Sequence, residues 1–216
     1  MLREEPMMGE GDRGGRVLDR VRPAGLVDVP ALVRLIASRA AGTPPVIDRA
    51  AEQVQAVLRL LLAHHALEVG HVWVAEQHTG ELIAAAVWLP PEADRDFSRF
   101  HGLIARELEI PPDLLALGRA DGEALEAARA GTRDWVLLVA SHEGDCSHVL
   151  LDRVLAPGLQ AVDRQNGTVV AWTASIPEAG RLEAFGFRDT RKVALPSGGH
   201  VWLTSRPPAT ARRPRH

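Results

Sequence analysis

A short polar stretch, SHEGDCSHVLLD at residues 141–152, carries several side chains that could do chemistry. His142 and Glu143 could act as a general base, and Cys146 could act as an acid or a nucleophile. The stretch follows an apolar run, WVLLVA, and leads into an apolar pattern with helical spacing. A loop that opens a helix after a strand can also bind a phosphate through its backbone N–H groups. The residues therefore allow proton transfer, anion binding, or both, at the end of one strand.

Each of these candidates also has a simpler interpretation. A single loop cysteine is usually incidental, and His142 and Glu143 fit a solvated loop equally well. Asp134, which heads the preceding strand, is a further candidate base, although a loop role is simpler. His64 and His65 are adjacent on a predicted helix, where neighbouring side chains point apart. The nine histidines show no spacing typical of a metal site, so no metal is predicted.

The composition is that of a soluble globular protein. The 216 residues are 46% hydrophobic and 25% charged, which is enough to bury a sizeable core. The net charge of −3 gives no reason to expect a nucleic acid or an anionic membrane surface as partner. The lone Cys146 excludes an intramolecular disulfide and fits a reducing compartment. The polar start does not resemble a signal peptide and no apolar run could span a bilayer, which predicts a cytoplasmic protein.

Strand and helix patterns alternate between residues 16 and 206, which form the predicted domain. Strands are predicted at 16–23, 71–76, 82–89, 134–140, 168–174, 188–195 and 200–205. Helices are predicted at 26–40, 47–69, 147–165 and 176–185, and within 94–130 with interruptions at PPD and GRADG. Residues 1–15 and 207–216 lack an apolar period and are predicted to be disordered. The order of elements indicates one mixed α/β domain.

Two helix boundaries carry special residues. Asp28 as N-cap and Pro30 in the first turn mark the start of the helix within 26–40. Pro157 and Gly158 conflict with an uninterrupted helix over 147–165, since an interior proline costs roughly 3 kcal/mol. A helix that starts only near Val154 would remove this conflict, and both interpretations remain open at this point.

The order of elements and four stretches of the chain resemble the GCN5-related N-acetyltransferase (GNAT) superfamily, in the form common among high-GC actinobacteria. The stretches are VRPAGLVDVPALVRL, HVWVAEQHTGELIAAAVWLPP, DWVLLVAS and RLEAFGF, and the similarity extends over residues 18–206. The resemblance implies a GNAT fold, which is a central mixed, mostly antiparallel sheet flanked by helices. Its fourth and fifth strands splay apart, and acyl-CoA enters the gap between them.

The resemblance also implies acetyl-CoA as co-substrate, with its pantetheine arm on the fourth strand and its pyrophosphate on the following helix. The implied cofactor-binding residues are Leu138, Val139, Ala140, Ser147, His148, Val149, Leu150, Leu151 and Asp152.

The phosphate-binding motif of the family, Q/R-x-x-G-x-G/A, is degenerate in this sequence. Counted without gaps it falls on Ser147, Leu150 and Asp152. A register that uses Gly144 places it instead on Glu143, Cys146 and His148. Both small residues are replaced in either register. Asp145 and Asp152 would also stand near the diphosphate and weaken its binding, which Arg153 or a protonated His148 could offset.

The usual catalytic acid of the family is missing as well. Many relatives have a tyrosine four residues before the closing G-F, and that position is Leu182 in a chain without tyrosine. The family's polar residue near the start of that segment has become Ile176 or Glu178. No catalytic residue is therefore assigned. Trp88, on the third predicted strand, is the tryptophan expected to face a substrate, because that strand borders the acceptor side in relatives.

Two functions are compatible with these features. One is an acetyl-CoA-dependent N-acetyltransferase that acts on a small-molecule amine or a peptide N-terminus. The other is a GNAT-like domain that has lost acyl transfer and binds a ligand, regulates, or serves a biosynthetic pathway by different chemistry. The family often dimerises, so a homodimer is one assembly that the resemblance allows.

Overall fold

The structure is a computed structural model that describes residues 18–40, 48–96, 108, 112–129, 134–142 and 147–212. A seven-stranded sheet with the order β1-β2-β3-β4-β5-β7-β6 forms its centre. Its strands are β1 (Leu18–Pro23), β2 (His71–Gln77), β3 (Leu82–Leu89), β4 (Trp135–Ser141), β5 (Val169–Thr173), β6 (Arg188–Ala194) and β7 (His200–Arg206). Only β4 and β5 are parallel, and every other neighbouring pair is antiparallel. The predicted mixed, mostly antiparallel sheet is confirmed.

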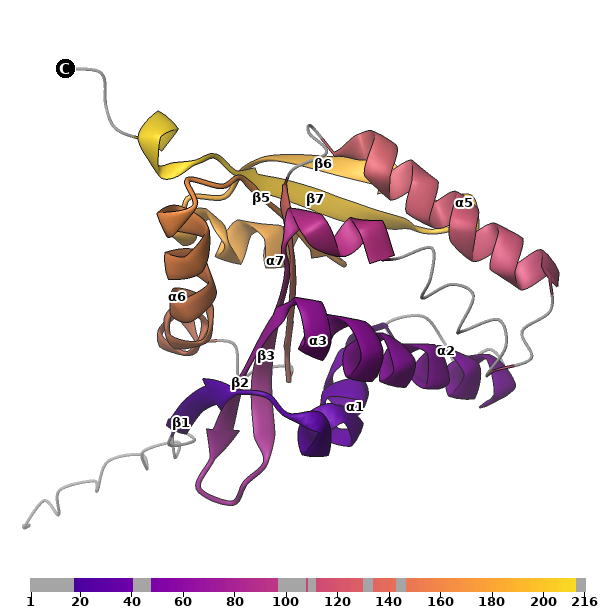
Figure 1. Ribbon diagram of the computed structural model, residues 1–216, viewed down its shortest axis with the longest axis horizontal. Coiled ribbons are helices and arrows are strands. Elements are labelled where there is room, and N and C mark those ends of the chain that lie inside the picture. Colours follow the sequence, from indigo (N-terminus) through magenta and orange to yellow (C-terminus); the bar gives the residue numbers. More distant parts are fainter. Residues whose placement is uncertain are drawn as a thin grey trace, which may run out of the picture.

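Helices cover both faces of this sheet (Figure 1). They are α1 (Val29–Ala40), α2 (Asp48–Leu61), α3 (Leu67–Val69), α5 (Pro112–Ala128), α6 (His148–Arg164) and α7 (Ile176–Arg181). A π-helical turn, η2 (Leu62–Ala66), joins α2 to α3, and short 3-10 turns are η1 (Leu26–Asp28), η3 (Pro91–Asp96), η4 (Glu183–Phe185) and η5 (Ala209–Arg212). Figure 1 shows α6 on one side of β2 and β3, and α1 and α2 on the other.

Each face of the sheet has its own apolar core, because successive strand residues point to opposite faces. On the α6 face, Trp88, Trp135 and Leu137 pack against the buried helix residues Leu151 and Val154. On the opposite face, the core is formed by a second set of buried residues from α1, η2 and the strands. These include Leu32, Val33, Leu35, Leu62, Val74, Val87 and Ala140. The alternation along β4 thus sends Leu137 and Ala140 to different cores.

Helix α6 runs without interruption from His148 to Arg164, with Pro157 inside it. This settles the choice left open by the sequence in favour of the longer helix. The neighbouring Gly158 explains how the helix approaches the sheet so closely. A Cβ atom at position 158 would overlap Cε2 and Nε1 of Trp88 and lie 2.6 Å from its Cδ2. Gly158 is therefore required by packing, since the buried indole of Trp88 lies directly against the helix backbone.

Two expectations differ from the structure. Helix α5 continues through GRADG, because Gly118 and Gly122 lie inside it. The tail was expected to lack structure from residue 207, but Ala209–Arg212 form a 3-10 turn and the Thr210 amide donates to Asn166 Oδ1 at 3.2 Å. Residues 1–17 and 213–216, which include the rest of the predicted disordered ends, lie outside the described residues.

In the described ranges, no helix is long and apolar enough to cross a membrane.

Asp28 joins the turn η1 to strand β1 rather than acting as a simple N-cap. Its carboxylate accepts hydrogen bonds from Arg22 Nη1 at 2.7 Å, from Arg22 Nη2 at 2.8 Å and from the Gly25 amide at 2.8 Å. The same guanidinium donates from Nε to Glu76 on β2 at 2.9 Å. The hydrogen bonds from Arg22 hold the pKa of Asp28 below its usual value, and the two carboxylates raise the pKa of Arg22.

Replacing Asp28→Asn is expected to destabilise the protein near neutral pH but not in acid. A carboxyl whose pKa is lowered by folding contributes stability above its unfolded pKa and loses it as pH falls through the lower folded pKa. The stability difference between the two proteins should be constant above about pH 5 and shrink once the pH falls below the ordinary value of 3.8. Urea unfolding at several pH values measures this difference. An equal difference at neutral and strongly acidic pH would show that the charge of Asp28 does not matter.

Candidate functional site

Strands β4 and β5 separate part-way along their length. Their parallel pairing runs from Trp135↔Val169 to Leu138↔Trp172 and ends there. Beyond this point β4 stays paired with β3 as far as Ser141, whereas β5 stays paired with β7 as far as Thr173. The two strands therefore open a gap toward their carboxyl ends. Polar backbone atoms at the edges of such a gap need partners, and an extended ligand can supply them.

A pocket lies at this gap. Its empty volume is about 300 Å³, which includes space open to solvent. It is lined by Val139, Ser141, Leu151, Thr173, Glu178, Arg181 and Leu182. These residues come from β4, β5, α6 and the segment from α7 to η4. The inner wall is mainly apolar, with a carboxylate and a guanidinium contributed by α7.

The N-terminus of α6 follows β4 and lies beside one pocket wall. Ser147 is the N-cap, and its Oγ accepts a hydrogen bond from the Leu150 amide at 3.2 Å. Helix geometry leaves the amides of the first residues, His148 and Val149, directed out of the helix end. The first turn carries no acidic residue. This helix end therefore has the backbone donors and the dipole that favour an anion.

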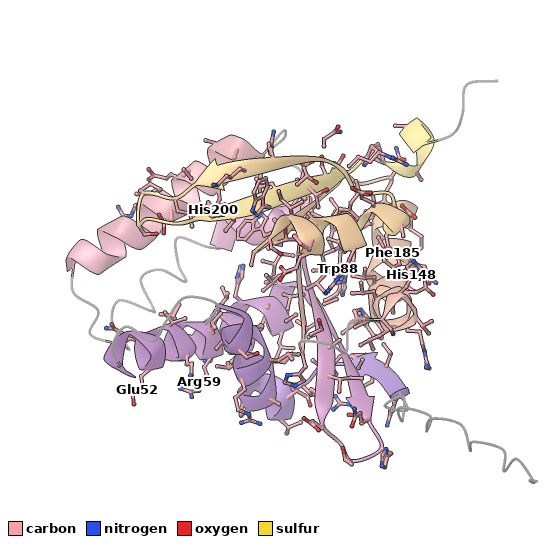
Figure 2. The ribbon with its side chains drawn as sticks, turned by 180° about the vertical axis from the view of Figure 1, so that it is seen from behind. Glu52, Arg59, Trp88, His148, Phe185 and His200 are labelled. Atoms are coloured by element: carbon pink, nitrogen blue, oxygen red, sulfur yellow. The ribbon has the colours of Figure 1, made fainter. Side chains whose placement is uncertain are left out.

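A contact between two aromatic rings, those of His148 and Phe185, connects the start of α6 to η4. The imidazole of His148 stacks on Phe185 with ring centroids 5.1 Å apart and an interplanar angle of 16°. Figure 2 shows the two side chains next to each other at the edge of the molecule. Arg206 holds the same segment from β7, because its Nε donates to the Phe185 carbonyl at 2.9 Å and its Nη atoms pair with Asp163. The α7–η4 wall is thus fixed to α6 from two sides.

Helix α7 contributes Glu178 to the pocket, and the carboxylate of Glu178 also caps the start of the helix. Ser175 is its N-cap, and the Ser175 hydroxyl accepts from the Glu178 amide at 3.4 Å. In return, Glu178 Oε2 accepts from the Ala174 amide at 3.0 Å. Glu178 therefore lines the pocket and stabilises the helix start at once. Leu182 lies one turn further along and is buried.

The implied cofactor-binding residues lie in three different environments. Val139 and Leu151 line the pocket, whereas Leu138 and Ala140 face the core beneath α1. Leu150 is also buried in the core on the α6 face. The exposed ones lie along the start of α6. These are Ser147, His148, Val149 and Asp152.

The candidate bases are widely separated. His142 is half-buried directly after β4, and its amide donates to the Ile83 carbonyl at 3.2 Å. Asp134 lies before the start of β4, at the opposite end of the strand from the gap, and its carbonyl accepts from Arg129 at 2.7 Å. Glu143, Asp145 and Cys146 lie outside the described residues. In the described ranges, no group of three or more His, Cys, Asp or Glu residues could hold a metal ion.

Trp88, which was expected to face a substrate, is fully buried in this structure. Its side chain has no exposed surface and lies inside the core between β3 and α6, against Gly158. The physical reason is strand alternation, which directs Trp88 toward α6 along with Ala84 and Ala86. The sequence identified the strand correctly but gave no means of deciding which of its faces a helix would cover.

No protein-family model matches the sequence. The structure is nevertheless similar to a solved structure described as histone acetyltransferase HPA2 and related acetyltransferase from Corynebacterium glutamicum. That alignment has 20% identity and a TM-score of 0.59, and covers 93% of this chain and 100% of the other. An N-acetyltransferase from Staphylococcus aureus aligns with 11% identity and a TM-score of 0.57, covering 87% of this chain and 100% of the other.

A third solved structure is a GNAT superfamily phosphinothricin acetyltransferase from Sinorhizobium meliloti in complex with AcCoA. It aligns with 12% identity and a TM-score of 0.53, over 91% of this chain and 93% of the other. These similarities, together with the parallel β4–β5 pair in an otherwise antiparallel sheet, show that the chain has the GNAT fold.

Proposed function

We propose that this protein is an acyl-CoA-dependent N-acetyltransferase that acetylates a primary amine on a small molecule or at a peptide N-terminus. The observation that carries the proposal is the gap between β4 and β5, with its pocket between α6 and α7. The Sinorhizobium meliloti enzyme of the same fold binds AcCoA, which supports acetyl-CoA as co-substrate. The lone cysteine suits a reducing compartment, and we place the protein in the cytoplasm.

The residues present fit an acyl-CoA in outline. The edge of β4 from Val139 to Ser141 would pair with the pantetheine amides, and Leu151 and Leu182 would form apolar walls beside the arm. The amides of His148 and Val149 at the start of α6 would receive the pyrophosphate. Acetyl-CoA supplies an activated acyl thioester when bound. Because Leu182 has no proton to donate, the leaving thiolate would depart without a side-chain acid at that position.

A second candidate function is binding without acyl transfer. The specific observation in its favour is the buried Leu182, which cannot donate a proton. The degenerate phosphate motif implied by the resemblance, with its small residues replaced at Leu150 and Asp152 or at Cys146 and His148, favours the same function. Leu150 is part of the core, so its side chain does not cover the helix end. The two functions share the pocket and differ in whether an acyl group leaves it.

A measurement of acetyl transfer distinguishes the two candidate functions. Purified protein is mixed with acetyl-CoA and a panel of primary amines, and the release of free thiol is followed with a thiol-reactive dye. The acetyltransferase proposal predicts thiol release that depends on both protein and amine. Tight binding of acetyl-CoA with no thiol release for any amine would favour the binding module.

Asp152→Asn is expected to tighten acetyl-CoA binding. The carboxylate is exposed near the start of α6, where it repels a diphosphate through solvent. Removing its charge should improve the dissociation constant by about threefold at low salt, and the gain should vanish at about 1 M salt because screening is then nearly complete. Isothermal titration at two salt concentrations measures both effects.

Asp189→Asn is the matched control for this charge change. Asp189 is exposed on β6 and has a positive φ of 58°, which asparagine also tolerates. Its replacement should leave acetyl-CoA binding unchanged. Weaker binding in Asp152→Asn would mean that the diphosphate does not lie near this end of α6.

A further inference from the structure

Trp172 occupies a special position in the gap. It is the last residue of β5 that pairs with β4, directly opposite Leu138. The next residue, Thr173, lines the pocket on the α7 side. Because neighbouring strand residues point to opposite faces, the Trp172 side chain lies on the other face of the sheet, which it shares with Leu138. Leu138 packs against the core beneath α1. Trp172 is thus located at the inner end of the gap, on the face away from α6.

The indole N–H of Trp172 is buried and has no hydrogen-bond partner among the described residues. A buried tryptophan N–H is normally paired, and leaving a buried donor unpaired is costly. The residue as a whole is half-buried, and within the described ranges it belongs to neither apolar core. Its environment is therefore that of a wall with an unused donor rather than that of a core residue.

Trp88 Nε1 and Gln77 Nε2 are likewise buried donors without a partner among the described residues, but neither lies at the gap. Trp88 Nε1 is enclosed in the core, because its side chain has no exposed surface. Gln77 Nε2 lies at the end of β2, next to the hairpin that leads to β3 and on the far side of β3 from β4. Of these three residues, Trp172 alone is both partly exposed and located beside the splayed strands.

We propose that the Trp172 indole N–H donates a hydrogen bond to the acyl carbonyl oxygen of an acyl-CoA bound between β4 and β5. This inference rests on the proposed function. If the amine binds on the opposite face of the sheet from the pocket, an acyl group that reaches it would pass the last paired residues, Leu138 and Trp172. The carbonyl is the hydrogen-bond acceptor that acyl-CoA has and free CoA lacks. Trp172 is thus a positioning and specificity residue for the acyl group, and its bond strengthens as negative charge develops on the oxygen.

Because of this hydrogen bond, the protein should bind acetyl-CoA more tightly than CoA, and the difference in affinity should depend on Trp172. In Trp172→Phe the dissociation constant for CoA should stay within about twofold, whereas acetyl-CoA should bind about fivefold more weakly, as expected for one lost hydrogen bond. The infrared carbonyl stretch of bound [1-13C]acetyl-CoA gives a second readout that does not depend on turnover. It should lie below its solution frequency in the wild-type protein and return toward that value in the variant.

Two further proteins keep this test decisive. Incorporation of 3-benzothienylalanine in place of Trp172 preserves the bicyclic ring and removes only the N–H, so it should behave like Trp172→Phe even if that variant is poorly folded. Trp73→Phe changes a half-buried tryptophan on β2, away from the gap, and should leave both readouts unchanged.

The outcomes distinguish this inference from the proposed function. An unchanged preference for acetyl-CoA and an unchanged carbonyl frequency in both position-172 proteins would overturn the role of Trp172 while leaving acyl-CoA binding intact. If wild-type protein binds neither CoA nor acetyl-CoA, the proposed function fails, and the inference fails with it.

Discussion

Gly158→Ala is expected to destabilise the protein by at least about 2 kcal/mol, although alanine is the better helix former. The reason is steric, because a methyl group at this position overlaps the indole of Trp88, which is fully buried and cannot move into solvent. Adding a methyl group to a packed core costs about 1–3 kcal/mol, and the overlap with the buried indole puts this site at or above the upper end of that range. About 2 kcal/mol or more therefore remains after the helix-propensity gain of about 1 kcal/mol. Chemical unfolding of both proteins measures the difference.

Gly122→Ala is the matched control. Gly122 also lies inside a 17-residue helix, α5, and no described atom lies within 4 Å of a Cβ placed there. Its replacement should be neutral or stabilise by up to about 1 kcal/mol. Combining Gly158→Ala with Trp88→Phe, which frees space, should cost less than the sum of the two single changes. Additive losses would show that the contact between these two positions is not the cause.

Val139→Trp is expected to weaken acetyl-CoA binding by at least about 100-fold, or about 2.7 kcal/mol. Val139 is half-buried on β4, just beyond the last residue that pairs with β5, and it lines the pocket. An indole in this place fills the gap that the pantetheine arm would occupy, while the sheet retains its pairing with β3. Titration calorimetry with acetyl-CoA measures the loss.

Val193→Trp provides the comparison for this change. Val193 is likewise half-buried, but it lies on the edge strand β6, outside the pocket. Val193→Trp should bind acetyl-CoA as tightly as the wild-type protein, and thermal unfolding should confirm that both variants are folded. If Val139→Trp binds acetyl-CoA as tightly as the wild-type protein, acyl-CoA does not lie between β4 and β5.

Periodicity in the sequence was sufficient to predict the sheet and most helices. The apolar runs that became β3, β4 and β5 are long enough to identify as strands, and their order with α6 and α7 indicated the arrangement. Residues 94–130 were the exception. Gly118 and Gly122 indicated a break there, but α5 accommodates both glycines because their positions are open and need no other conformation.

The site was harder to predict, because four elements contribute to it and each strand residue has two possible faces. Val139 and Leu151 were expected to bind acyl-CoA and do line the pocket, but Ser141, Thr173 and Arg181 were not singled out. The alternation of β4 carries a usable signal, since Val139 and Ser141 must share a face. The burial of Trp88 had no such signal, because it depends on which face of β3 is covered by α6.

Isothermal titration of the wild-type protein with acetyl-CoA and with CoA tests the central claim most directly. The gap between β4 and β5 and the backbone donors of α6 predict saturable binding of both, with dissociation constants in the micromolar range and tighter binding of acetyl-CoA. No heat of binding for either compound up to millimolar concentration would contradict the account, because it would show that this GNAT fold does not use its gap for acyl-CoA.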